Sequence, residues 1–172
     1  GCGNEMATEK PMVRKFIVDS CVHWVKDYNI DGLRFDLMEL IDYKTMREIT
    51  KRCSALKDNF LIYGEPWTGG PSSVKNGTYK GRQKGQNFSI FNDTFRNGIR
   101  GDNSPNKGFI NGDCSNRDKA WTIVEGLKGS IFTSSYLPME SINYSDAHDN
   151  YTLWDQIIKS QNNVSDNSIY RN

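Results

Sequence analysis

The amino-acid sequence predicts an α/β fold in which helices cover a parallel sheet. Amphipathic helical segments alternate with short apolar segments, the first connections are short, and acidic residues follow three strand-like segments. Parallel strands need a crossover connection, which is usually a helix. The 172 residues are 36% hydrophobic and 25% charged, a composition typical of one soluble globular domain.

The first element is an expected helix from about Pro11 to Tyr28. A proline in the first helical turn is harmless, because its missing N–H has no partner inside the helix. Apolar residues recur at three- and four-residue steps and are expected to form one face. This set comprises Val13, Phe16, Ile17, Cys21, Trp24, Val25 and Tyr28.

A strand is expected next, within residues 31–38, where three apolar residues alternate with Arg34 and Asp36. An extended strand places these two charged residues together on the face opposite the apolar ones. A cation and a carboxylate on an otherwise buried strand cost desolvation unless they pair or serve a site. This stretch alone leaves open a structural ion pair or a functional site.

The remaining elements continue the alternation. A second helix is expected near Tyr43 to Leu56, and the next strand begins at Phe60 and leads to Glu65. The loop at 66–87 is too long for a simple connection and is expected to be functional or mobile. Later elements are a strand at 88–92, a helix at 93–100, a loop at 101–112, a helix at 116–127, a strand at 142–147 and a helix at 151–160. The polar tail from 161 is expected to fray.

Two architectures suit this order, a doubly wound sheet and part of a (β/α)₈ barrel. Both place function at the carboxyl ends of the strands. Asp36, Glu65 and Asp149 each follow a strand-like segment, and convergence of three acids on one mouth is more natural in a closed barrel. A complete barrel needs roughly 250 residues. A piece of one would expose unpaired sheet edges and apolar surface, which predicts poor solubility.

Three short motifs carry a family resemblance. The segments GLRFDLM, YGEPW and HDN resemble the second, third and fourth signature regions of the α-amylase clan of glycoside hydrolases. Stretches at 9–16, 91–102 and 148–155 are similar to type I pullulanases in particular, and the similarity extends over nearly the whole chain. This resemblance implies that 1–172 is a fragment of the catalytic domain, a partial TIM (β/α)₈ barrel with roughly strands 4 to 7. The first strands, the last strand and the first signature region are then expected to be absent.

The acids suggest a division of catalytic labour. Retaining glycosidases need an ionised nucleophile and a protonated carboxyl group about 5–5.5 Å apart. Arg34, on the same strand face, would keep Asp36 charged, so Asp36 is the predicted nucleophile. Glu65 follows an apolar strand beside Trp67, a setting that favours the protonated form of a general acid and base. The resemblance implies the same two roles.

The resemblance also implies the rest of the site. Asp149 would stabilise the transition state by bonding sugar hydroxyls, with His148 as a second sugar contact. Arg34, Trp67 and Asn150 complete the predicted substrate-binding set. For His148 the alternative is a loop histidine with backbone bonds, and Trp67 could stack on a glucose ring or fill the barrel rim.

The predicted function is cleavage of α-1,6-glucosidic linkages in pullulan, amylopectin or glycogen-type glucans, with the isolated chain an inactive piece. The bond specificity rests on the resemblance alone. Alternatives are an isoamylase or glycogen-debranching relative, an α-1,4-acting amylase relative, and a noncatalytic α-glucan-binding fragment. A nucleotide-binding α/β domain is disfavoured, because no glycine-rich turn links a strand to a helix.

Charge and cysteine content limit the other partners. A net charge of +1 gives no reason to expect nucleic acid or an anionic membrane. No apolar run approaches a membrane span, and the N-terminus lacks the basic and apolar parts of a signal peptide. The compartment, cytoplasmic or secreted, and the oligomeric state stay open.

No cofactor or metal site is predicted, and calcium binding by a longer parent protein stays open. Cys2, Cys21, Cys53 and Cys114 have no C-x-x-C spacing, which argues against zinc. Cys21 and Cys53 are expected to be buried free thiols within helices.

Overall fold

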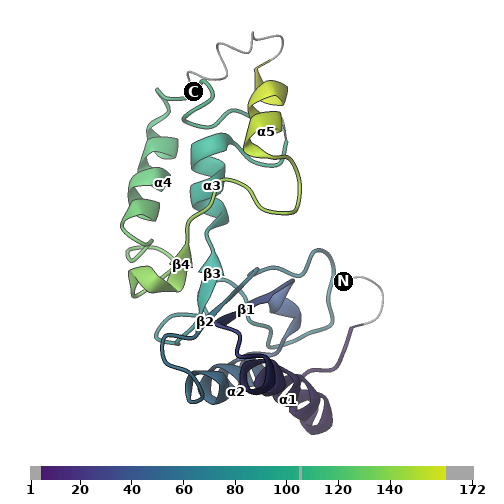
Figure 1. Ribbon diagram of the computed structural model, residues 1–172. Helices are drawn as coiled ribbons and strands as arrows, with labels where there is room; N and C mark the ends of the chain where they lie inside the picture. The colour runs from purple at the N-terminus through teal and green to yellow at the C-terminus, as the bar shows by residue number, and fades with distance from the viewer. Residues whose placement is uncertain (1–4, 105, 162–172) are drawn as a thin grey trace. The chain divides into compact units, whose positions relative to one another are not determined.

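The computed structural model describes residues 5–104 and 106–161, which divide into two compact units (Figure 1). Residues 5–91 and 134–140 form the first unit, and the remaining described residues form the second. The predicted polar tail beyond Gln161 lies outside the described residues, as does Cys2.

The first unit has the predicted α/β architecture. Its elements are α1 (Pro11–Tyr28), β1 (Gly32–Phe35), α2 (Tyr43–Ser54), β2 (Leu61–Gly64) and β3 (Ser89–Phe91), with two short 3₁₀ helices at Met38–Leu40 and Pro138–Glu140. β1 pairs in parallel with β2, and β2 pairs in parallel with β3. α1 and α2 lie side by side against one face of this sheet (Figure 1). The α/β prediction is therefore confirmed.

The core of this unit lies between the helix pair and the sheet. Its buried residues are Val18, Cys21, Val25, Met38, Met46, Ile49, Cys53, Phe60, Ile62, Phe88 and Ile90. The prediction that Cys21 and Cys53 are buried free thiols is confirmed. Burial, with a smaller contribution from the nearby Cys53, raises the pKa of the Cys21 thiol to about 12.

α1 has the predicted bounds but not the predicted apolar face. Phe16, Trp24 and Tyr28 are 66%, 45% and 61% exposed, although their spacing placed them on the face expected to be apolar. Only a narrower stripe, Val18, Cys21 and Val25, is buried among the helical residues. The periodicity identifies all apolar positions, whereas burial depends on the width of the surface that α2 and the sheet offer.

The start of α2 is fixed by a buried polar cluster. Asp42 caps the helix by accepting hydrogen bonds from the backbone N–H groups of Lys44 and Thr45. It also lies 3.2 Å from Nη2 of Arg14, and its own N–H donates to the Thr8 hydroxyl at 2.8 Å. Burial raises the pKa of Asp42, but the hydrogen bonds from Thr45 and the Arg14 cation outweigh it and leave the pKa below its usual value.

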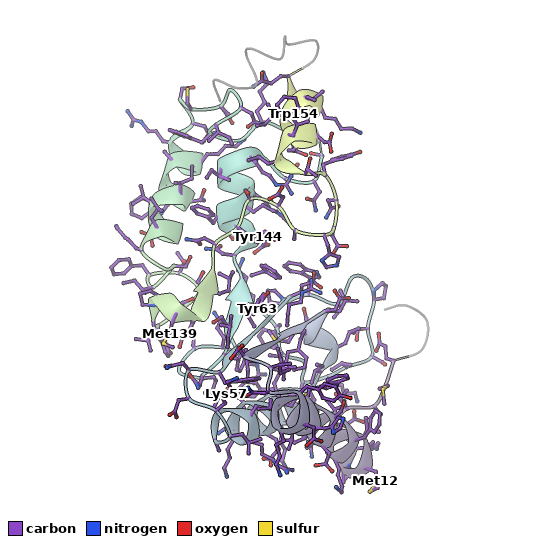
Figure 2. The ribbon with its side chains drawn as sticks, in the orientation of Figure 1. Met12, Lys57, Tyr63, Met139, Tyr144 and Trp154 are labelled. Atoms are coloured by element: carbon purple, nitrogen blue, oxygen red, sulfur yellow. The ribbon has the colours of Figure 1, made fainter. Side chains whose placement is uncertain are left out.

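A lysine secures the link between α1 and β1. The ammonium group of Lys57, which is labelled in Figure 2, donates to the Asn29 carbonyl at 3.0 Å and pairs with Asp31 at 2.6 Å. Asn29 has the left-handed φ of 53° that commonly ends a helix. The connection from α1 to the start of β1 is thus held in place by a residue that follows α2.

The long loop between β2 and β3 is packed rather than loose. The Thr78 N–H donates to the Ile41 carbonyl at 3.0 Å, and the Tyr43 N–H donates to the Asn76 carbonyl at 2.8 Å. Gln83 is fully buried and donates to the Ser134 carbonyl at 2.7 Å. These bonds attach the loop to the beginning of α2 and to the segment at 134–140.

The second unit contains three helices and a two-residue strand. These are α3 (Asp93–Arg100), α4 (Arg117–Leu127), α5 (Leu153–Ser160) and β4 (Ser141–Ile142). α3 has the predicted bounds, and it packs against α4 with the Phe95 ring over Gly126. The strand predicted at 142–147 is wrong beyond Ile142. There, Asn143 donates to the Gly126 carbonyl at 2.8 Å, and such polar side-chain bonds compete with strand pairing.

Among residues 5–104 and 106–161, none of the helices combines the length and apolarity that a bilayer crossing requires.

Candidate active site

Arg34 connects two of the predicted catalytic acids at the carboxyl ends of β1 and β2. Its Nη1 lies 2.5 Å from Oδ1 of Asp36, and its Nη2 lies 2.7 Å from Oε1 of Glu65. A guanidinium group is planar and small, so contact with both carboxylates places them within a few ångströms of each other. The structure thus brings together Asp36, Glu65 and their cation from two neighbouring strands.

The two acids differ sharply in exposure. The Glu65 side chain is 4% exposed, whereas the Asp36 side chain is 62% exposed and reaches solvent at the edge of the sheet. The Asp36 carboxylate is therefore accessible to a ligand from solvent, while the position of the Glu65 carboxyl group is set by the protein groups around it. This asymmetry suits two carboxyl groups with different tasks.

The surroundings of Glu65 are more polar than the sequence suggested. Its Oε1 receives the Arg34 guanidinium, and its Oε2 accepts a hydrogen bond from the Leu37 backbone N–H at 2.8 Å. Each carboxyl oxygen of Glu65 therefore accepts a hydrogen bond from a fixed neighbour. The apolar environment expected beside Trp67 is therefore only part of the local chemistry.

Aromatic residues hold Arg34 from the side of β3. The Arg34 guanidinium lies 5.7 Å from the centroid of the Phe91 ring, a cation–π distance. The Phe91 ring in turn meets the Tyr63 ring edge-on, with centroids 5.4 Å apart. Sequence reasoning missed Phe91, because a phenylalanine that ends a short strand carries no distinguishing local signal.

A tight turn follows β1 and ends at the 3₁₀ helix. Leu37 has φ 43° and ψ 50°, the left-handed region that costs a residue other than glycine about 1–2 kcal/mol. Met38 is fully buried against Gly64, where an added Cβ would lie 2.9 Å from its Sδ. Backbone strain of this kind clusters at functional sites.

The other predicted site residues lie in loops. Trp67 is half-buried two residues beyond Glu65, and its stacking on sugar stays a prediction. His148, Asp149 and Asn150 lie in the exposed loop before α5, with Nε2 of His148 3.5 Å from Oδ1 of Asp149. These three residues belong to the second unit, so their convergence with Asp36 stays a prediction.

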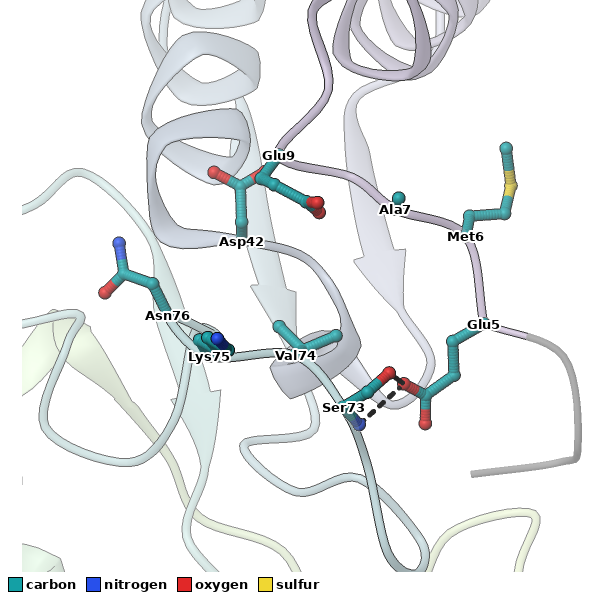
Figure 3. A pocket seen from close by; sticks show the side chains of 9 residues that line it. All are labelled: Glu5, Met6, Ala7, Glu9, Asp42, Ser73, Val74, Lys75 and Asn76. Atoms are coloured by element: carbon teal, nitrogen blue, oxygen red, sulfur yellow. Dashed lines mark hydrogen bonds between the residues drawn. The ribbon is translucent and has the colours of Figure 1, made fainter.

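A separate pocket of about 340 Å³ lies in the first unit and contains none of the predicted site residues (Figure 3). It is lined by Glu5, Met6, Ala7, Glu9, Asp42, Ser73, Val74, Lys75 and Asn76. Oε2 of Glu5 accepts hydrogen bonds from the Ser73 N–H and hydroxyl, which join the N-terminal segment to the long loop (Figure 3). The backbone bond from Ser73 lowers the pKa of Glu5.

Metal-ligating residues do not gather in the described part of the chain. No group of three or more His, Cys, Asp or Glu side chains there could hold a metal ion.

The chain is similar to curated proteins over more than nine-tenths of its length. The pullulanase of Bacillus subtilis (strain 168) is 36% identical over an alignment 167 residues long, which covers 91% of this chain and 23% of that protein. Isoamylase 3, chloroplastic, of Oryza sativa subsp. japonica is 30% identical over an alignment 169 residues long, which covers 91% of this chain and 20% of that protein. The glycogen debranching enzyme of Erwinia tasmaniensis is 30% identical over an alignment 164 residues long, which covers 91% of this chain and 23% of that protein. No family model matches the chain.

Solved structures give the same result. Pullulanase from Bacillus acidopullulyticus superposes with a TM-score of 0.92 at 42% identity, covering 98% of this chain and 21% of that one. Pullulanase from Anoxybacillus sp. LM18-11, complexed with maltotriose, gives 0.83 at 33% identity, covering 96% and 24%. The resemblance to type I pullulanases and the partial-barrel fold are thereby confirmed. The chain spans about one fifth to one quarter of the length of these relatives.

Proposed function

We propose that this chain is a section of the catalytic barrel of a type I pullulanase-like glycoside hydrolase that cleaves α-1,6-glucosidic linkages in branched α-glucans. The contact of one guanidinium group, that of Arg34, with both Asp36 and Glu65 carries the proposal. Similarity to pullulanases over more than nine-tenths of the chain supports it. Because the chain spans a small share of these relatives, the activity belongs to a complete barrel containing this segment.

The proposed reaction is a double displacement with retention. Asp36 attacks the anomeric carbon while Glu65 gives its proton to the glycosidic oxygen, so that bond breaks and a glycosyl ester forms on Asp36. In the second step, the oxygen of a water molecule attacks the same carbon while Glu65, now a carboxylate, takes a proton from that water. The bond between the sugar and Asp36 then breaks. Arg34 holds the Asp36 carboxylate in place through the contact of its Nη1 with Oδ1 of Asp36.

Other predicted residues act on the sugar itself. Asp149 accepts hydrogen bonds from hydroxyl groups of the reacting sugar ring. These hydrogen bonds strengthen as positive charge develops on the ring in the transition state. His148 and Asn150 add polar contacts, and Trp67 offers an aromatic face for stacking. The expected substrates are pullulan, amylopectin and glycogen-type glucans.

A chimera tests the catalytic proposal in a complete barrel. The aligned segment of the Bacillus subtilis pullulanase is replaced by this chain, and reducing-sugar release from pullulan is measured. Asp36→Asn is expected to lower kcat by at least about 10³-fold, because the nucleophile is lost. Glu65→Gln is expected to lower it by about 10²–10⁴-fold, the usual contribution of a general acid and base.

The matched control is Asp31→Asn, an acid 91% exposed at the other end of β1. It should leave kcat within about twofold of the parent chimera, because surface charge changes have small effects. Full activity in the Asp36→Asn chimera would reject the proposal.

Linkage specificity is tested with the same chimera. Pullulan and amylopectin offer α-1,6 bonds, and linear amylose offers only α-1,4 bonds. Hydrolysis of amylose at a rate similar to that of pullulan would favour an α-1,4-acting amylase. Preference for glycogen over pullulan would favour an isoamylase or glycogen-debranching activity, as found among the 30% identical relatives.

A second candidate function is noncatalytic binding of α-glucan. The observation that favours it is the small share of each relative that this chain covers. Calorimetric titration of the 172-residue chain with maltotetraose measures such binding directly. A binding-only role requires that the chimera bind maltotetraose without hydrolysing pullulan, and hydrolysis abolished by Asp36→Asn would exclude it.

A further inference from the structure

The turn at Leu37 has a consequence for the protonation of Glu65. We infer that Leu37 is a positioning residue whose backbone N–H fixes Oε2 of Glu65 as an accepting oxygen and thereby assigns the transferable proton to Oε1. The inference rests on the proposed function for its catalytic meaning, but its geometry and its test concern this chain alone.

The peptide N–H of Leu37 is directed at Glu65 by the end of β1. The Glu65 N–H donates to the Phe35 carbonyl at 3.1 Å, so the backbone of Glu65 is aligned with the last residue of that strand. The left-handed conformation of Leu37 then reverses the chain, and the Leu40 N–H donates to the Leu37 carbonyl at 2.8 Å. The N–H of Leu37 points to Oε2 of Glu65 from this turn, at 2.8 Å.

Packing on both sides locks the turn. Met38 is fully buried against Gly64. On the other side, the Leu37 side chain lies over Gly69, with its Cδ2 3.2 Å from the position that a Cβ would take there. The N–H of Leu37 therefore cannot rotate away without breaking these contacts.

Arg34 is the donor that can leave. A proton on a carboxyl oxygen makes that oxygen a hydroxyl donor, so an N–H donor aimed at the position of the new hydrogen must move aside. The Leu37 N–H is part of the locked backbone, whereas the Arg34 guanidinium ends a long side chain and already contacts Asp36 at 2.5 Å. The proton therefore enters at Oε1, where it displaces Nη2 of Arg34.

This geometry couples the two acids. When Oε1 of Glu65 takes a proton, Arg34 loses its contact with Glu65 and keeps its contact with the Asp36 carboxylate. The single exchange yields a protonated acid and a charged nucleophile together, which is the pair that retaining hydrolysis requires. The competing explanation is that the Leu37 turn serves only the packing of Met38, in which case the N–H has no influence on the proton of Glu65.

Two substitutions at position 37 separate these explanations. Leu37→Val disfavours a left-handed φ, because β-branched residues rarely adopt it, and should turn the N–H away. Leu37→Gly accepts the same φ without strain, and the buried Met38 beside it still anchors the turn, so the N–H should stay directed at Glu65. Both remove the leucine side chain, so they form a matched pair.

The measurement is a carbon-13 NMR titration of the glutamate carboxyl groups in the 172-residue chain, with the Glu65 signal assigned from Glu65→Gln. Loss of a hydrogen bond to a charged group should move the Glu65 midpoint upward by about one pH unit or more in Leu37→Val. Leu37→Gly should stay within a few tenths of a unit of the unsubstituted chain. Equal midpoints in the three folded proteins, or an equal shift in both variants, would overturn the inference.

A backbone change keeps the inference testable if Leu37→Val fails to fold. Replacing residue 37 by its α-hydroxy acid makes an ester at the 36–37 bond, which replaces the N–H by an oxygen atom and keeps the leucine side chain. The same upward shift is expected, and an unchanged midpoint would overturn the inference. Since this titration needs no sugar cleavage, its outcome is independent of the Asp36→Asn chimera, whose retained activity would overturn the proposed function instead.

Discussion

Replacing Asp42 by alanine should destabilise the first unit by about 2–4 kcal/mol at pH 7. The Asp42 side chain caps α2 through the N–H groups of Lys44 and Thr45, and loss of such a cap costs about 0.5–2 kcal/mol. The variant also strands Arg14, whose side chain is 17% exposed. Arg14 retains its bond to the Glu9 carbonyl, so the penalty stays below the roughly 3–5 kcal/mol of a fully buried broken pair.

Urea denaturation followed by circular dichroism at 25 °C measures this loss. Asp42→Asn keeps a capping oxygen but removes the charge, so its free energy of unfolding should fall between those of the parent and Asp42→Ala. Asn116→Ala is the control, because Asn116 caps α4 in the second unit through the N–H groups of Asp118 and Lys119. That variant should lose only about 1 kcal/mol.

The effect of Asp42 should depend on pH with a definite sign. Its pKa is lowered in the folded chain, because the Thr45 hydrogen bonds and Arg14 outweigh the opposing effect of burial. A depressed carboxyl pKa contributes stability that is complete above the unfolded value of about 3.9 and is lost as the pH falls through the folded value. The difference between the parent and Asp42→Ala should therefore shrink below about pH 4. A difference under about 0.5 kcal/mol at pH 7, or one constant down to pH 2.5, would refute this reasoning.

Two further predictions concern buried contacts. Iodoacetamide should alkylate the exposed Cys114 in the native chain, and peptide mass spectrometry can follow the reaction. Cys21 and Cys53 should react at least about 10²-fold more slowly, because burial disfavours their thiolates. Rapid labelling of Cys21 in the native chain would contradict its burial. Gly64→Ala places a Cβ 2.9 Å from Sδ of Met38 and should lower the free energy of unfolding by about 1–3 kcal/mol in urea titrations. An unchanged urea midpoint would show that the turn after β1 is loosely packed.

The features that the sequence predicted best are local. α1 and α3 have the expected bounds, because apolar spacing and a first-turn proline act within a few residues, and the structure shows that Asn92 also caps α3 by accepting from the Phe95 N–H. Strand alternation predicted that Arg34 and Asp36 lie together, and they do form an ion pair, but the strand expected within 31–38 ends at Phe35 and Asp36 lies in the turn that follows. Each of these signals is complete within one segment of the chain.

The features that escaped prediction depend on distant partners. The ion pair between Arg34 and Glu65 follows from the register in which Arg34 lies opposite Tyr63, and a single strand does not encode that pairing. The left-handed Leu37 carries no glycine or asparagine signal, because packing of its neighbours imposes the conformation. Exposure of Trp24 similarly reflects the limited surface opposite α1 rather than the periodicity of the helix.

Gly64 also affects how a mutational map of this site should be interpreted. It has no side chain that could take part in chemistry, yet its missing Cβ is what lets Met38 settle beside it and brings the Leu37 amide to Glu65. Random mutagenesis of a barrel containing this segment should therefore yield inactive clones altered at position 64 as well as at Glu65. Loss of activity on substitution of Gly64 would then reflect the close approach of the backbone, whereas loss on substitution of Glu65 would bear on its proposed role as acid and base.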